Sequence, residues 1–554
     1  MERALGVPEI VSQVLQNVNK SNQTSAARTC RFWSCIALDW IWKDMKSFYP
    51  LLELLSPLVI RGNEWHFPPD LSNANWDRFD SYASRIRKLE HNDDRKFQGF
   101  PAIPSPHLFS RITERRSPRL ITPNVFDIIW TSRDATTLPL VLYFVSPTVT
   151  ALEINCDGDA VSACPALLDG LNQLDLSLHR FIFAADGSNR DYVPNLTTFI
   201  SGQKRLITAF LPPFSATSLL VNVLGELPLL QEYANWSTVE YQWPDESGMC
   251  FRWVPGTFKT LQKLGFDAWP SLTDGSVLLE SPHTTNLHTL LLTCRSVFHA
   301  DALHSLTTTL ATVHHNLTDI TLSLFAVDDN NPSPESIGFD CIRPLLQCRA
   351  LSFLHLWHNQ AVTYTKEEIV AMAAAWPMME VLELFADPTL DTGWEHGQPL
   401  QSVGVFLEKF SVLTHLAVFI NVVSAAIPKE SHVAIIDLCK LKILDFGTSP
   451  GMFEDNPDVQ RDVALYISTI VTRDVKIRGH RSAGHIRGVA TTEEDDEEYD
   501  ARFSFWFDIG TRVELVFAAR QHMTEDMHAL TLRNHALLER IRELEQSQGA
   551  LITS

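Results

Sequence analysis

One short segment of the sequence has the spacing of a catalytic nucleophile. Residues 447–451 read Gly-Thr-Ser-Pro-Gly, a G-x-S-x-G match in which Ser449 would be the nucleophile of a hydrolase. Such an elbow requires a helix directly after the serine. Pro450 and the following Met-Phe-Glu-Asp-Asn-Pro indicate a turn instead. We interpret the segment as the end of a structural repeat, and hydrolase activity remains only a third hypothesis for this chain.

Other residues of chemical interest lack the spacing that catalysis or metal binding requires. The sequence contains no H-E-x-x-H, P-loop or dinucleotide-binding motif, and His314 and His315 do not have metal-ligand spacing. The nine cysteines include no C-x-x-C pair. We therefore expect no catalytic residues, no metal site and no cofactor.

Composition restricts the partners and the compartment. The chain of 554 residues has 45 Lys and Arg against 66 Asp and Glu, a formal net charge of −21, which argues against general affinity for nucleic acids or anionic membranes. An odd number of dispersed cysteines fits free thiols in a reducing compartment. The first ten residues lack the apolar core of a signal peptide. We expect an intracellular protein, cytoplasmic or nuclear.

The first fifty residues have the pattern of short amphipathic helices. Pro8 suits a first helical turn, and it precedes an apolar stripe that runs from Ile10 to Val18. Ser21 or Asn22 is expected to cap a second helix, and Asp39 a third. Three helices of this length bury too little surface to form a robust core alone, so this segment requires a partner surface.

The two runs VPEIVSQVL and AARTCRFWSCIALDWIWKDM, within residues 7–46, resemble the F-box, especially the fungal kind. F-boxes bind the Skp-type adaptor of a cullin-RING ubiquitin ligase. The residues NANWDRFDSYASRIRKLE (73–90) are expected to form an amphipathic helix and also resemble the segment that follows the F-box in fungal proteins with leucine-rich repeats. The alternative is that residues 7–46 are the N-terminal cap of a larger core. The resemblance implies an adaptor interface on Pro8, Ile10, Val11, Leu15, Trp33, Ile36 and Trp42.

A repeated pattern, apolar-x-x-apolar-x-apolar, occupies the middle of the chain. It starts at residues 149, 171, 196, 230, 261, 287, 317, 351, 379, 413 and 441, with a mean spacing of about 29 residues. The last apolar positions are two apart, as on one face of a strand, and intervening tracts such as KEEIVAMAAAWP (366–377) have helical character. Stacked units of this kind form a parallel sheet with helices on its other face. The pattern resembles irregular, long leucine-rich repeats.

These observations predict an α/β fold, with a small all-helical F-box followed by an irregular leucine-rich-repeat solenoid that has parallel strands on its concave side and helices outside. The expected domains are an F-box (1–50), a helical or irregular connection and N-terminal cap (51–140), the repeat array (141–520) and a C-terminal helix and tail (521–554). Residues 479–500, which include the acidic block 493–498, are expected to form a solvated loop. RFSFWFDI and RVELVFAA, within residues 502–519, are expected to form two closing strands.

The concave side of such an array is the usual recognition surface. At the sixth residue after each start, three successive repeats have Trp357, Phe385 and Phe419, and the neighbouring row includes His355 and Glu383. Aromatic side chains surrounded by polar groups are typical of protein-binding sites, so these five residues are the predicted target-binding residues. The alternative is that these aromatic side chains belong to the core. That would follow if a loop crosses the sheet over them, or if the predicted inward–outward alternation of the strands is shifted by one residue.

The C-terminal residues have heptad spacing. Met523, Met527, Leu530, Asn534, Leu537, Ile541 and Leu544 recur at intervals of three and four. We favour an amphipathic helix that folds back onto the last repeat as a cap, and the alternative is a weak homodimer through residues 523–546.

The sequence as a whole predicts a non-catalytic, substrate-recognition adaptor of a Skp-cullin-F-box ubiquitin ligase. The F-box would bind the adaptor, and through it the cullin-RING ligase, while the repeats would bind a protein marked for ubiquitination. The alternative function is a leucine-rich-repeat scaffold for protein interactions that has no association with a ligase.

Overall fold

The computed structural model describes residues 6–62, 64–93, 103–116, 120–185, 190–212, 217–235, 257–269, 272, 279, 286–294, 300–324, 338–358, 362–384, 397–422, 440–447, 449, 457–479 and 493–552. The chain divides into two compact units, Met1–Ser296 (unit 1) and Val297–Ser554 (unit 2). Phe385 and the residues 480–492 of the predicted acidic loop lie outside the described residues.

Unit 1 begins with the three expected helices, α1 (Pro8–Gln16), α2 (Lys20–Ala27) and α3 (Arg31–Lys43). Pro8 occupies the first turn of α1. Their boundaries differ from the prediction, because the side chain of Asn19 caps α2 and that of Cys30 accepts the Trp33 amide at the start of α3. Asp39 therefore lies inside α3 rather than at the start of a third helix.

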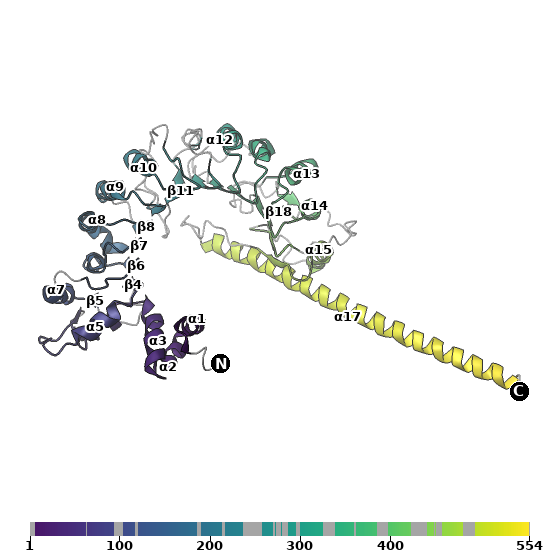
Figure 1. The fold of residues 1–554 in the computed structure, drawn as a ribbon. Helices are drawn as coiled ribbons and strands as arrows, with labels where there is room; N and C mark the ends of the chain where they lie inside the picture. Colours follow the sequence, from purple (N-terminus) through teal and green to yellow (C-terminus); the bar gives the residue numbers. More distant parts are fainter. Residues whose placement is uncertain are drawn as a thin grey trace. The chain divides into compact units, whose positions relative to one another are not determined.

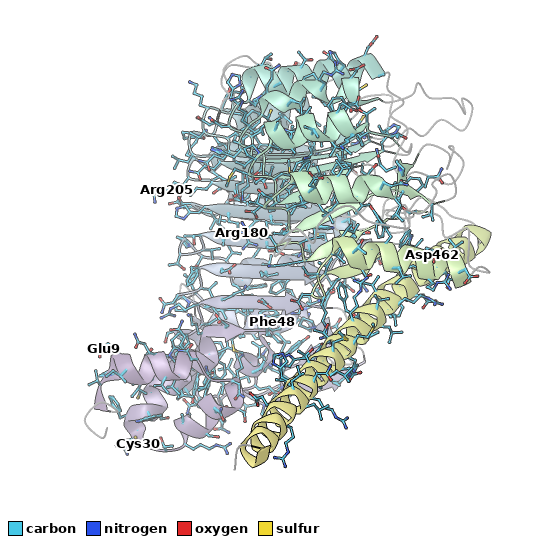
Figure 2. The ribbon with its side chains drawn as sticks, turned by 90° about the vertical axis from the view of Figure 1, so that its right-hand side faces the viewer. Glu9, Cys30, Phe48, Arg180, Arg205 and Asp462 are labelled. Carbon is cyan, nitrogen blue, oxygen red and sulfur yellow. The ribbon has the colours of Figure 1, made fainter. Side chains whose placement is uncertain are left out.

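The helices continue directly into the sheet. β1 (Asp44–Met45) follows α3 without a linker and pairs with β4 (Lys88–Asn92). Phe48 is fully buried beside Phe109, Trp130 and Phe144, so residues 44–48 belong to the first repeats as well as to the helical segment. Figure 2 shows Phe48 where the N-terminal helices meet the strands, with Glu9 and Cys30 out on those helices.

The predicted helix 73–90 is shorter in the structure. α5 (Trp76–Ala83) buries Phe79 and Ala83, and the chain then changes to β4, in which Leu89 and His91 are buried and their neighbours half-buried. The period of burial thus changes from about 3.6 to 2 within this segment. The parallel strands begin at β1, upstream of the array start predicted at 141.

The strands of the main sheet in unit 1 pair in chain order and are all parallel. Helices lie along one side of them, as Figure 1 shows for α8, α9 and α10. The remaining strands of this sheet are β6 (Asp127–Ser132), β7 (Ala151–Cys156), β8 (Arg180–Ala185), β9 (Thr208–Leu211), β10 (Glu232–Asn235), β11 (Lys263–Trp269) and β12 (Thr289–Cys294). The other elements are α4 (Tyr49–Leu52), α7 (Pro106–Arg116), η2 (Leu138–Tyr143), η3 (Gly158–Ala163), α8 (Cys164–Asn172), α9 (Val193–Gly202), α10 (Ser218–Gly225) and a small sheet of β2 (Val59–Arg61), β3 (Glu64–His66) and β5 (Ile103–Pro104).

Unit 2 repeats this arrangement, with its strands again parallel and in chain order. The strands are β13 (Asp319–Leu324), β14 (Phe353–His358), β15 (Val381–Leu384), β17 (His415–Val418), β19 (Ile443–Asp445) and β20 (Lys476–Arg478). The helices are α12 (Ala300–Val313), η6 (Phe339–Cys341), η7 (Arg343–Gln347), α13 (Lys366–Ala375), α14 (Gln401–Lys409), α15 (Pro457–Ile470) and α17 (Glu493–Ile552), and β16 (Gln398–Pro399) pairs with β18 (Ile420–Asn421).

The fold prediction is confirmed: the chain is an α/β protein with N-terminal helices followed by a leucine-rich-repeat-like solenoid. Nine of the eleven predicted repeat starts lead directly into an observed strand. The starts at 171 and 196 were wrong, since residues 171–172 end α8 and residues 196–201 lie within α9. The strands of those repeats are β8 and β9, which follow later in the chain. The prediction failed there because, over six residues, the apolar spacing of a short helix matches that of a strand.

The C-terminal region differs most from the prediction. Residues 493–552 form one helix, α17, so the acidic block 493–498 is helical rather than a loop and the two strands predicted within 502–519 were wrong. Phe505, Trp506, Ile509 and Val513 are buried, a helical spacing that packs α17 against α15 and β20. None of the helices in the described parts of the chain has the length and apolar character needed to span a bilayer.

Candidate binding surfaces

The predicted adaptor-binding residues divide into buried and accessible ones. Val11 and Leu15 are only 0% and 2% exposed, and with Ala26 and Ala37 they form the small core of the three helices. Val11 and Leu15 thus belong to the core of the helices and are not accessible to a partner in this structure. Their burial has a simple cause: they lie on the face of α1 that packs against α3.

The face of α1 beside this buried one is apolar and accessible. Pro8 and Ile10 are exposed as predicted, and the sequence interpretation omitted Val7 and Val14, which are 37% and 43% exposed. Spacings of three and four residues from Val7 to Ile10 to Val14 place these three side chains on one stripe, a signal that was present in the sequence. Phe32, at the start of α3, adds another exposed apolar side chain. We call Val7, Ile10, Val14 and Phe32 the helical apolar patch.

Trp33, Ile36 and Trp42 are half-buried. Trp33 and Ile36 pack against the three-helix core, and the ring of Trp42 lies 4.7 Å from that of Tyr82 on α5. Arg85, two residues beyond α5, hydrogen-bonds the Cys35 carbonyl at 3.0 Å and pairs with Asp39. Trp42 and Arg85 therefore link α3 to α5 and the segment that follows it. The sequence did not indicate this structural role of Trp42.

A second candidate surface lies on one side of the strands of unit 2. It is the side opposite the one on which the buried, alternate residues of these strands lie. In β14 the second and fourth residues are buried while the first and third, Phe353 and His355, are half-buried. The same alternation gives Val381 and Glu383 on β15. The parallel register aligns His355 with Glu383 and Phe353 with Val381. We call this side of β13–β20 the open face.

A charged cluster occupies the centre of the open face. Glu383 pairs with Nδ1 of His355, and its other carboxylate oxygen lies 3.4 Å from Nδ1 of His415 on β17. Burial alone would raise the pKa of Glu383, but the hydrogen bond from His355 and the charges of both histidines outweigh it and lower that pKa below its usual range. Glu383 is thus an ionised carboxylate held between two histidines.

A second pair lies further along the same row. Arg478 Nε on β20 donates to Asp445 Oδ2 on β19 at 2.7 Å, and the Gly447 amide donates to Asp445 Oδ1 at 2.9 Å. The carboxylate of Asp445 is nearly fully buried, while Arg478 is 40% exposed. The guanidinium is accordingly the part of this pair that an incoming molecule would meet.

Apolar side chains lie beside these charges. Phe353, Val381 and Ile443 occupy the first positions of β14, β15 and β19 and are half-buried. His415 separates Val381 from Ile443 in the register. An apolar centre flanked by polar and charged groups is the usual composition of a protein-binding surface. The sequence interpretation found His355 and Glu383 here but missed Phe353 and Val381, which stand two residues before them.

Two residues of the predicted aromatic row are buried. Trp357 and Phe419 are only 6% and 4% exposed, so the open face does not present these side chains to a partner. Strand alternation would place both outward. At Phe419 a connecting segment lies against this end of the strand, since β16 pairs with β18 and the Gln398 backbone amide donates to the Phe419 carbonyl at 2.9 Å. For Phe419 this agrees with the alternative that a loop lies across the sheet.

Ser449 is not arranged as a nucleophile. It is fully buried, its hydroxyl donates to the Phe446 carbonyl, and it accepts the Ile420 amide at 2.9 Å. Its own carbonyl accepts the Trp506 indole N–H at 2.9 Å. Gly447 has φ +54°, which glycine adopts readily at the turn after β19. Ser449 therefore has a structural role, linking the segment after β19 to β18 and α17. Within the described residues, no three His, Cys, Asp or Glu side chains are grouped for a metal ion.

No protein-family model matches the chain, and no curated protein matches it. Among solved structures, the chain is similar to an internalin (inlF) from Listeria monocytogenes, with 14% identity over 55% of this chain and 76% of that chain and a TM-score of 0.27. The strand order and the side-chain contacts of the chain itself define its fold.

Proposed function

We propose that this protein is a non-catalytic recognition subunit of a Skp-cullin-F-box ubiquitin ligase, in which the N-terminal helices bind the adaptor and the repeats bind a protein target. The observation that carries the proposal is the helical apolar patch. Three short helices form a minimal core and still leave Val7, Ile10, Val14 and Phe32 exposed on the segment that resembles an F-box. An exposed apolar stripe on one helix, such as Val7, Ile10 and Val14 on α1, is what a partner groove buries.

The target would bind at the open face of unit 2. Phe353 and Val381 supply apolar contact area, while the His355–Glu383–His415 cluster supplies charge-assisted hydrogen bonds. Such a subunit contributes proximity: holding a target beside the ubiquitin-carrying enzyme raises the effective concentration of the acceptor lysine. The chain would thus perform no chemistry of its own.

Direct binding to a purified Skp-type adaptor tests the first half of the proposal. We expect the full chain to bind, and Ile10→Glu combined with Val14→Glu to weaken binding at least about 30-fold, as loss of about 2 kcal/mol requires. Both side chains are exposed, so the double variant retains the fold. Met378→Glu, at a 58% exposed position in unit 2, is the matched control and should bind like the unmodified chain.

A deletion is a poorer test than these substitutions. Removing residues 1–48 would also remove β1 and the buried Phe48, which belong to the sheet and its core. Loss of adaptor binding would then report unfolding as well as loss of an interface.

The open face is tested by comparing the proteins that co-purify with Phe353→Glu and with Met378→Glu. We expect a target retained by the control and lost from Phe353→Glu, with adaptor recovery unchanged for both. The alternative function is a repeat scaffold without a ligase. It predicts that Phe353→Glu loses the target in the same way, but that the adaptor co-purifies with neither the unmodified chain nor its variants.

A further inference from the structure

Helix α17 has two parts with different surroundings. Its first part is anchored: Trp506 and Ile509 are fully buried, and the Trp506 indole donates to the Ser449 carbonyl. The last described hydrogen bonds from α17 to other elements are Arg520 to the Ser468 carbonyl and Arg473 to Gln521, both at 2.9 Å. Figures 1 and 2 show α15, which carries Asp462, side by side with this part of α17.

The second part continues as a helix to Ile552, a further 31 residues, or about 46 Å at 1.5 Å per residue. Every described side chain from residue 519 to residue 540 is exposed. They include Met523, Met527, Leu530 and Leu537, with exposures of 67%, 62%, 54% and 55%. An isolated helix with this much exposed apolar surface is marginally stable in water, so this part requires a partner.

The spacing of the apolar residues defines the kind of partner. In a heptad labelled a to g, Met527 is at a, and Met523, Leu530 and Leu537 are at d; Ile541 and Leu544 continue the a and d positions in the sequence. Together these positions form the coiled-coil seam (Met523, Met527, Leu530, Asn534, Leu537, Ile541 and Leu544). Leu at d, with Ile and Met at a, suits a two-stranded coiled coil.

Two features favour a second copy of the same helix, in parallel. Asn534 occupies a single a position, where two asparagines facing each other across a parallel dimer hydrogen-bond and fix the register. Arg540 is at g, and Glu545 is at the e position that it meets on a parallel partner. An antiparallel pair would instead place Asn534 against an apolar d residue.

We propose that the chain forms a parallel homodimer through residues 523–546 of α17. The alternative was that residues 523–546 fold back onto the last repeat as a cap. In the structure the buried side chains of Phe505, Trp506, Ile509 and Val513 form that cap, which leaves the coiled-coil seam available. The inference does not depend on adaptor binding, which involves the other end of the sequence. A dimer would present two open faces, and bivalent targets would bind with increased avidity.

Sedimentation equilibrium of the full chain over about a hundred-fold range of concentration tests the dimer. We expect the mass to rise from that of one chain to that of two. Leu530→Glu with Leu537→Glu should raise the dissociation constant at least about ten-fold, because both side chains lie on the seam. Leu532→Glu is the matched control, since Leu532 is 59% exposed but lies at f, off the seam, and this variant should dimerise normally.

Oxidative cross-linking tests the orientation. Met523→Cys and Leu537→Cys are each expected to give a disulfide-linked dimer, because a parallel register places identical d positions opposite each other. The unmodified chain, which already has exposed Cys30 and Cys35, measures the background. A chain of single mass at every concentration overturns the proposal, and equal loss of association in Leu532→Glu and the seam variant overturns the coiled-coil geometry.

Discussion

We expect the buried His91 to make the first repeats sensitive to acid. Its ring lies on the inward side of β4, 4.6 Å from the ring of Phe48 and 4.3 Å from that of Trp130, and it is only 2% exposed. Neither ring nitrogen has a hydrogen-bond partner among the described residues. Burial in this aromatic cluster therefore penalises the imidazolium and lowers the pKa of His91 to about 3.

The sign of the effect follows from that depressed pKa. The pKa of a histidine in the unfolded chain is about 6.5, and above that pH the imidazole is neutral in both the folded and the unfolded chain. Below that pH the unfolded chain binds a proton that the folded chain does not. Folded-state stability is thus complete above about pH 6.5 and is lost progressively as the pH falls toward 3. At pH 5, about 1.5 units below the unfolded value, the loss is about 2 kcal/mol, since one unit corresponds to about 1.4 kcal/mol.

The measurement is amide hydrogen exchange of the segment Lys88–Asn92, followed by mass spectrometry at pH 7.5 and pH 5 and corrected for intrinsic rates. This local readout is suitable because a chain of two units need not unfold in one step. Between pH 7.5 and pH 5, we expect the opening free energy of the unmodified chain to fall by about 2 kcal/mol more than that of the His91→Leu variant.

His107→Leu is the matched control, because His107 is an exposed histidine of the same unit, on α7. It should leave the pH dependence of β4 unchanged. If His91→Leu and the unmodified chain lose the same opening free energy, the imidazole is not held neutral in the core and the reasoning is refuted.

Four further substitutions test the open face and its surroundings. Trp357→Ala and Phe419→Ala should each lower the unfolding free energy by about 3–5 kcal/mol, measured by urea denaturation, because both side chains are buried; a negligible change would return them to the binding surface. Glu383→Gln should cost on the order of 1 kcal/mol at neutral pH. Since the pKa of Glu383 is lowered, that cost should disappear as the pH falls from about 4.3 through the folded-state value, and a pH-independent cost would contradict the ion-pair assignment. Ser449→Ala should lower stability by about 1–3 kcal/mol because the buried Ile420 amide loses its acceptor, and any esterase activity that this variant abolished would contradict the structural role.

Local patterns in the sequence determined much of the repeat architecture. The helix α13 begins at the Thr365 capping box, with Glu368 at its third position, and the apolar run of each repeat from residue 230 onward leads into a strand. These features depend on neighbours within a few residues, so the sequence alone contains the needed information. The same holds for α1, whose start at Pro8 follows from the fixed backbone angle of proline.

Long-range packing decided what the local patterns left open. Residues 502–519 have apolar runs that suit a strand or a helix, and contacts with α15 and β20 select the helix by burying Trp506, Ile509 and Val513. Trp357 and Phe419 should face outward by strand alternation, yet both are buried, and the segment after Phe419 pairs with β16 from the preceding connection. Val11 and Ile10 are neighbours with similar side chains, and only the position of α3 makes one core and the other surface. In each case the deciding contact joins residues far apart in the chain, which no short pattern specifies.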